Sequence, residues 1–311
     1  MANPLPGIHI GHWHDLGAGT GCTVLLPTAG EMRAGVHVGG GAPGTRETDV
    51  LEPTATVQHI HALLLTGGSA FGLDAAGGVM RYLREQGIGF QTPVARVPIV
   101  PAAVIFDLDL GSPQAAPDAE AGYAACRAAS EDERREGTVG AGCGASVGRM
   151  RGPDFRSKGG IGLATSEPIN SVVVGALAVV NAVGDVVARD GTIIAGTRSE
   201  KGFVGSAALL KYANAITAQP GTNTTLVAIA TNAHVDKVGL TRLAQQAQDG
   251  LALAISPVHT SFDGDTVFAL STGDQACNLD SLAVMAIEMV ALAIRRAIQQ
   301  ATSLLGVRAV S

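Results

Sequence analysis

Charged and aromatic side chains are scarce in this chain of 311 residues, at 15% and 4% respectively. Positive charge is not in excess, since the formal net charge is −6, and no basic run with interleaved aromatic residues occurs. Proteins that bind nucleic acid usually carry a basic patch or stripe. We therefore expect no nucleic-acid partner.

Cysteine is also rare, and its four copies are widely spaced, at Cys22, Cys126, Cys143 and Cys277. Neither a paired-cysteine metal motif nor a redox motif is present, which is typical of a reducing compartment and predicts a cytoplasmic protein. Two His-x-His pairs have no evident third ligand in the sequence. We predict no metal site and no other cofactor.

Long hydrophobic runs are missing. The apolar stretch at residues 172–188 is interrupted by glycine, asparagine and aspartate, and its valines are typical of strands. A membrane helix would need about 20 consecutive apolar residues. Residues 1–15 carry no basic start followed by an apolar stretch, so no signal peptide is predicted. We expect no membrane partner.

The residues that dominate the chain are small and aliphatic: 46% are hydrophobic and 41 are glycine. This composition suits closely packed layers of sheet and helix. No repeat or long linker divides the sequence, so we predict one domain over residues 1–311. Hydrophobic periodicity predicts strands at 59–66, 226–230 and 267–271, hairpin strands within 161–188 that turn at 181–185, and helices at 73–86, 118–135, 237–253 and 281–298.

The last of these helices is apolar nearly all round, apart from Glu288, Arg295 and Arg296. Such a helix is normally buried between layers or at a subunit interface. A carboxylate in an apolar setting is rarely left unpaired. We therefore expect Glu288 to orient a site from behind, to bind Arg295 or to bind a partner subunit.

The junction between Asp265 and Thr266 is the most informative feature of the sequence. It places a hydroxyl where a strand is predicted to begin, directly after the acidic turn Asp263-Gly264-Asp265. Attack of the Thr266 hydroxyl on the Asp265 carbonyl would cut the chain and leave Thr266 as a new N-terminus. Its α-amine, with a pKa of roughly 7.7 to 8.0, would then serve as a general base. Taken alone, the segment also fits a solvated turn before an ordinary strand.

Further motifs precede this junction in a fixed order: Gly44-Thr45-Arg46-Glu47-Thr48-Asp49, the stretch from Leu65 to Asp74, Gly140-Ala141-Gly142-Cys143-Gly144-Ala145 and Asn223-Thr224-Thr225. Together they resemble the L-aminopeptidase/D-Ala-esterase family, which includes β-peptidyl aminopeptidases and nylon-oligomer hydrolases. The resemblance covers residues 7–297. It implies a self-cleaving N-terminal-nucleophile amidase with a four-layer α/β/β/α sandwich, cut into residues 1–265 and 266–311. It also implies a homotetramer acting on a small peptide or amide substrate, with a threonine nucleophile as in the nylon-oligomer branch.

The resemblance also implies roles for individual residues. Asn223 matches the family position whose amide serves the oxyanion hole, and Asn232 is our second choice for this role. Lys158 matches a lysine close to the site, where its charge would hold the Thr266 amine neutral. Glu136 falls where aminopeptidase members bind the free amine of the substrate. Because Thr138 stands where those members carry a tyrosine, the substrate class stays open.

Other functions fit parts of the sequence. His259, Asp263 and Asp265 have the residue types of a divalent-cation site, as in a metal-assisted hydrolase or a cation-binding module. Ornithine acetyltransferases also cut themselves before a threonine and have a related layered fold, although their local motif is not found here. A non-enzymatic scaffold would leave the threonine at the strand start and the ordered glycine motifs unexplained.

Overall fold

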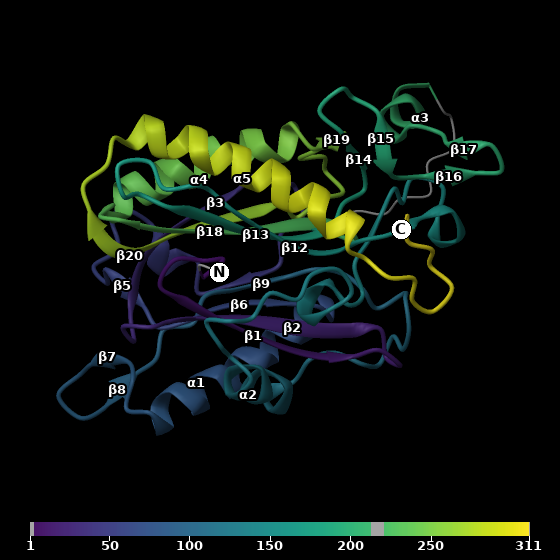
Figure 1. Cartoon of the computed structure of the whole chain (residues 1–311). Coiled ribbons are helices and arrows are strands. Elements are labelled where there is room, and N and C mark those ends of the chain that lie inside the picture. The colour runs from purple at the N-terminus through teal and green to yellow at the C-terminus, as the bar shows by residue number, and fades with distance from the viewer. Residues whose placement is uncertain (1–2, 213–220, 311) are drawn as a thin grey trace.

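In the computed structural model, which describes residues 3–212 and 221–310, the chain is arranged in four layers (Figure 1). Two β-sheets are stacked face to face, and a pair of helices covers the outer face of each sheet. The α/β/β/α sandwich implied by the resemblance is therefore confirmed.

The first sheet and the two helices that cover it come from the N-terminal part of the chain. Its strand order is β1 (Ile8–Asp15), β2 (Thr20–Pro27), β6 (Leu63–Thr66), β9 (Ala102–Val104) and β4 (Thr45–Arg46). Helices α1 (Ala75–Glu85) and α2 (Ala119–Arg127) cover it. Because side chains alternate along a strand, Val24 packs under these helices whereas Leu25 packs against the other sheet.

The second sheet holds the predicted nucleophile. Its strand order is β12 (Gly160–Thr165), β13 (Val174–Asn181), β18 (Thr224–Ala233), β20 (Thr266–Gln275), β3 (Met32–Val38) and β5 (His59–Ile60), and it is covered by α4 (Lys237–Ala252) and α5 (Leu279–Gln299). Strand β20 runs parallel to β18 and antiparallel to β3, so that Thr266 is paired with Leu226 on one side and Val38 on the other. Phe268 and Leu270 face the layer between the two sheets.

Short elements make up the rest of the described chain. They are β7 (Phe90–Gln91), β8 (Arg96–Val97), β10 (Ser146–Val147), β11 (Ser157–Lys158), β14 (Asp185–Val187), β15 (Ile193–Ala195), β16 (Arg198–Ser199), β17 (Gly202–Phe203), β19 (Ile255–Ser256), α3 (Ser206–Tyr212) and the 3-10 helices η1 (Asp49–Leu51), η2 (Ser69–Asp74), η3 (Gly140–Gly142) and η4 (Pro153–Phe155). Strands β14, β15 and β19 form a small separate sheet near α3.

Most predicted elements are present, with some changes of boundary. The strand predicted at 59–66 is divided at residues 61–62 into β5 and β6, which belong to different sheets. The helix predicted at 118–135 ends at Arg127, the last residue of α2. Within 161–188, β12 and β13 do form a hairpin, but it turns at residues 166–173. The predicted hairpin turn at 181–185 is wrong, because this segment leads from β13 to β14, which pairs with β15 and β19 in the small sheet.

Within the single chain, the C-terminal helix is not buried all round between layers, so that expectation is wrong, while burial at a subunit interface stays a prediction. Helix α5 buries one face against β12 and β13 and leaves Val284, Glu288 and Leu292 exposed. Within the described chain Glu288 forms no ion pair, and Arg295 instead donates to two backbone carbonyls. Neither α5 nor any other helix among residues 3–212 and 221–310 is long and apolar enough to span a membrane.

Candidate active site

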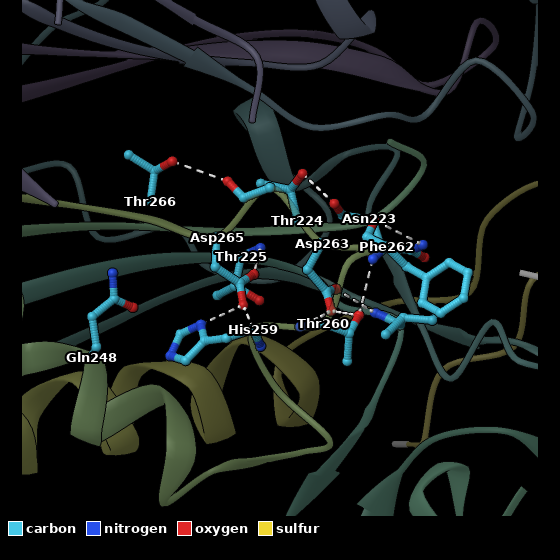
Figure 2. Close-up of polar contacts among 12 residues, drawn as sticks. Asn223, Thr224, Thr225, Gln248, His259, Thr260, Phe262, Asp263, Asp265 and Thr266 are labelled. Atoms are coloured by element: carbon cyan, nitrogen blue, oxygen red, sulfur yellow. Dashed lines mark hydrogen bonds and ion pairs between the residues drawn. The ribbon is translucent and has the colours of Figure 1, made fainter. Parts of the chain in front are cut away.

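Thr266 is the first residue of β20, at the centre of the second sheet. Its side chain is completely buried and lies on the same side of the strand as Phe268, facing the layer between the sheets. The hydroxyl donates a hydrogen bond to the carbonyl of Gly264 at 2.9 Å (Figure 2). The threonine is thus held in the protein interior with its hydroxyl close to the backbone of the preceding turn.

The carbonyl of Asp265, which belongs to the peptide bond to Thr266, accepts two backbone hydrogen bonds. The N–H of Gly39 donates at 2.9 Å and the N–H of Gly40 at 3.2 Å. Both glycines directly follow β3, the neighbour of β20. These two residues were not predicted as site residues, although the run Gly39-Gly40-Gly41 is a visible sequence signal for close backbone approach.

The Asp265 side chain points to the opposite side of the strand from Thr266, as alternation requires. Its carboxylate is buried and accepts hydrogen bonds from the N–H of Thr225 at 2.7 Å and the N–H of His259 at 3.1 Å, and Nδ1 of His259 lies 2.9 Å from Oδ2. Burial alone would lower the pKa of His259, but the hydrogen bond and charge of Asp265 outweigh it and raise that pKa.

Asp263, at the other end of the turn, is buried and bonded in a similar way. The N–H of Val183 donates to Oδ1 at 3.1 Å, and the hydroxyl of Thr260 donates to Oδ2 at 2.5 Å. Burial, together with the charge of Asp265, raises the pKa of Asp263 to about 7. Because both carboxylates are anchored inside the protein, the segment is not a solvated turn, and that interpretation is wrong.

The geometry of these carboxylates does not favour a cation site. Backbone N–H groups and a hydroxyl point at their oxygens, where a metal ion would require lone pairs. In the part of the chain that the structure describes, no three histidine, cysteine, aspartate or glutamate side chains gather in a way that could hold a metal ion.

Asn223 lies beside the same turn. It directly precedes β18, forms a bridge with Asp263, and accepts a hydrogen bond from the N–H of Gly264 on its backbone carbonyl at 2.8 Å. Its side-chain amide is buried and donates to the hydroxyl of Thr222 at 3.1 Å, while Oδ1 has no hydrogen-bond partner among the described residues. The structure therefore brings Asn223 to the turn that precedes Thr266, without a direct bond to the threonine.

Asn232, the second choice for the oxyanion role, lies elsewhere. It is six residues beyond Leu226, the partner of Thr266, which corresponds to about 20 Å along an extended strand. Its amide is also bonded at both ends, to the N–H of Val173 and the carbonyl of Ser171 at 2.8 Å each. The structure rules out Asn232 as the oxyanion donor.

Lys158 is completely buried among backbone carbonyls. Its Nζ donates to the carbonyls of Gly142, Ala145 and Gly159 at 3.0, 2.9 and 2.9 Å. Burial lowers the pKa of Lys158 to about 7. These bonds tie β11 to the glycine-rich segment around η3, and in the described chain Lys158 makes no hydrogen bond to Thr266.

Glu136 is occupied by an arginine. Its carboxylate forms an ion pair with the guanidinium of Arg296 on α5, in which Nε donates to Oε1 at 2.9 Å and Nη2 contacts Oε2. It also accepts a hydrogen bond from the N–H of Leu163 on β12 at 2.8 Å. Glu136 therefore connects a helix to a strand, and an ammonium group would have to compete with Arg296 for it.

Comparison with known proteins relates the whole chain to peptide and amide hydrolases. Residues 4–310 match Peptidase family S58. An uncharacterized aminopeptidase of Mycobacterium leprae is 43% identical over 86% of this chain and 77% of its own length. A 6-aminohexanoate-oligomer endohydrolase of Paenarthrobacter ureafaciens is 34% identical over 86% and 74%. The solved L-aminopeptidase D-Ala-esterase/amidase of Ochrobactrum anthropi, a variant of the Ntn hydrolase fold, shares the fold with a TM-score of 0.72 at 18% identity, over 96% and 86%.

Proposed function

The chain belongs to peptidase family S58, and from this premise we propose that it is an N-terminal-threonine amide hydrolase that matures by cutting its own Asp265–Thr266 bond. That it hydrolyses peptide or amide bonds follows from its family and from its aminopeptidase and oligoamide-hydrolase relatives. The proposal concerns the nucleophile, the self-cleavage and the residues that assist them.

The observation that carries the proposal is the burial of Thr266 behind a turn that is anchored at every position. Asp263 and Asp265 are each held by buried donors, and the carbonyl between the cut residues accepts two N–H groups. An ordinary surface turn needs none of these contacts. A bond that must reach one reactive geometry needs its neighbours fixed in this way.

In the self-cleavage, Thr266 Oγ1 forms a bond to the carbonyl carbon of Asp265 and the bond from that carbon to the Thr266 nitrogen breaks. The proton of the hydroxyl ends on this nitrogen, which becomes an amine. Water then hydrolyses the ester, which restores the hydroxyl and leaves Asp265 with a new carboxylate. The chain is thereby divided into residues 1–265 and 266–311.

In turnover, the same hydroxyl attacks the amide of a substrate and the new amine of Thr266 accepts its proton. The acyl group passes to Oγ1, the amine part of the substrate leaves with a proton, and water releases the acid. We assign the oxyanion of this step to the side-chain amide of Asn223, which lies buried beside the turn. The substrate class proposed is a short peptide or a linear oligoamide, as the names of the relatives indicate.

A homotetramer, as the family resemblance implies, also belongs to this proposal. The exposed apolar side chains Val284 and Leu292 on α5 support it, since an oligomer would bury them. Light scattering coupled to size-exclusion chromatography measures the assembly directly, and a monomer at micromolar concentration would contradict a tetramer.

Mass analysis of the purified protein tests the self-cleavage. We expect two chains, the smaller with 311 − 265 = 46 residues, and Edman sequencing of it should read Thr-Val-Phe-Ala-Leu. Thr266→Ala should remain a single chain without amidase activity, whereas Thr266→Ser should retain part of both because serine keeps the hydroxyl. A different N-terminus, or one intact chain after prolonged incubation of the wild type, would refute the proposal.

A further inference from the structure

We propose that the backbone N–H groups of Gly39 and Gly40 form the oxyanion hole for self-cleavage, and that this hole is separate from the Asn223 amide used in turnover. The inference rests on the proposed self-cleavage at Asp265–Thr266 and adds to it the groups that stabilise its transition state.

The geometry results from an irregularity in the sheet. Strands β20 and β3 are paired residue by residue from Ser271↔Arg33 to Thr266↔Val38. One step further, Asp265 faces two residues, because both Gly39 and Gly40 donate to its carbonyl, at 2.9 and 3.2 Å. Two residues opposite one is the arrangement of a β-bulge, a feature that is frequent next to active sites. The ladder therefore places two donors on the oxygen that becomes charged when Thr266 attacks.

Glycine is required at position 40 for this approach. A Cβ atom there would lie 2.4 Å from the carbonyl oxygen of Asp263 and 2.4 Å from the nitrogen of Asp265. The atoms nearest to a Cβ atom at Gly39 would instead belong to the side-chain amide of Gln248, at 3.0 to 3.2 Å. The backbone at Gly40 can lie against the reacting bond only because it carries no side chain.

The donors are also fixed in advance. The two residues that follow continue the contact with the turn, since the N–H of Gly41 donates to the carbonyl of Thr260 at 3.3 Å and the N–H of Ala42 to that of Asp263 at 2.9 Å. Four successive N–H groups thus bind one turn. Donors that are already oriented in a water-excluded site cost no reorganisation when charge develops, and removal of one such donor typically slows a reaction by about 10²- to 10³-fold.

The assignment gives each step its own donors. During attack, the electron pair of the Asp265 carbonyl moves onto its oxygen, which Gly39 and Gly40 stabilise until the C–N bond breaks. After hydrolysis the same N–H groups bind the new carboxylate of Asp265. The substrate oxyanion then depends on Asn223, which approaches the turn from β18 rather than from β3.

The test compares two alanine variants of the full chain by the rate at which the 46-residue chain appears. We expect Gly40→Ala to slow this rate by about a hundredfold or more, because its methyl group displaces the backbone from the scissile carbonyl. Gly77→Ala, the control, lies in α1, where an added Cβ would meet open space, and should cleave at the wild-type rate. Once Gly40→Ala has cleaved during long incubation, its turnover per cleaved molecule should be near that of the wild type, whereas a generally distorted site would lose turnover as well. Cleavage of Gly40→Ala at the wild-type rate would overturn the proposal.

A second measurement does not depend on the folding of Gly40→Ala. In the full chain with Thr266→Ala, which should stay uncleaved, NMR should detect scalar coupling from the Gly39 and Gly40 amides across hydrogen bonds to the Asp265 carbonyl carbon. Absence of both couplings would overturn the proposed hole. The two proposals fail differently: a wild type that never yields an N-terminal Thr266 refutes self-cleavage, whereas a wild type that cleaves alongside an equally fast Gly40→Ala refutes only the oxyanion hole.

Discussion

Nδ1 of His259 lies 2.9 Å from Oδ2 of Asp265. Asp265 is the residue directly before the bond that we expect to be cut. The backbone N–H of the same histidine donates to the same oxygen at 3.1 Å. His259 adopts a positive φ of 55°, which costs energy for a residue with a side chain. The two contacts to Asp265 stabilise this conformation, so the histidine and the carboxylate hold the turn together as a unit.

This pair predicts a pH dependence of folding stability. The pKa of His259 in the folded protein is raised above its ordinary value of 6.5. The stabilisation that the protonated histidine gives to the folded state is therefore complete below pH 6.5 and is lost as the pH rises through the folded pKa. In the uncleaved Thr266→Ala chain, we expect His259→Gln to lower the free energy of unfolding most at low pH and least at high pH. Urea unfolding between about pH 5 and pH 9 measures the difference. Asp263, with a pKa of about 7, titrates in the same range, and its charge also contributes to the raised pKa of His259. A difference that grows with pH would contradict the assignment.

Asn223 should matter for turnover more than for cleavage. We expect Asn223→Ala to lower the turnover rate of cleaved enzyme by about a hundredfold or more, with a smaller effect on substrate affinity, because the amide acts on charge that develops in the transition state. Asn232→Ala is the control, since it removes the same group at the far end of β18. Assays with an amino-acid p-nitroanilide and an aminohexanoate oligomer measure both variants. Normal turnover by cleaved Asn223→Ala would show that another group serves the oxyanion.

Lys158 should matter for stability. Lys158→Met leaves three buried carbonyls without their donor, which should lower the free energy of unfolding of the Thr266→Ala chain by about 2–4 kcal/mol. The exposed Lys201→Met serves as control and should change little. If stability were unchanged and the acidic limb of the amidase pH profile moved upward instead, Lys158 would act on the Thr266 amine, as the family resemblance implies.

The sequence was sufficient to predict the layers but not the environment of the polar residues. Periodicity located α4 and β20, and the ordered motifs led to the four-layer sandwich. Helix α5 appeared apolar nearly all round because alanine and larger aliphatic residues make up most of it. Its exposed stripe nevertheless contains Val284 and Leu292, which hydropathy does not distinguish from core residues.

Hydrophobic periodicity could not identify the partners of polar residues that are far apart in the sequence. The residues that bind Asp265 come from three separate segments: Gly39 and Gly40 after β3, Thr225 in β18, and His259 before the turn. Sheet order brings these segments together, and one sequence without its sheet order does not specify which strands are neighbours. The same reason explains Glu136, whose partner Arg296 is 160 residues away in the chain.

Substitution of Glu136 distinguishes a structural role of its carboxylate from a role in substrate binding. Because its carboxylate is bonded to Arg296 and to the N–H of Leu163, we expect Glu136→Gln to lower the free energy of unfolding by about 1–2 kcal/mol, a modest loss since the guanidinium is partly solvated. The exposed Glu167→Gln is the matched control. With cleaved enzyme, the ratio of kcat/KM for a substrate with a free amine to that for its N-acetylated form should not change. If Glu136→Gln selectively lowered kcat/KM for the free-amine substrate, the carboxylate would exchange Arg296 for the substrate ammonium. The amine-binding role implied by the resemblance would then hold. We expect the unchanged ratio, because the Glu136 carboxylate is already paired with Arg296 in the unliganded protein. An incoming ammonium group gains little free energy where a guanidinium must first be displaced.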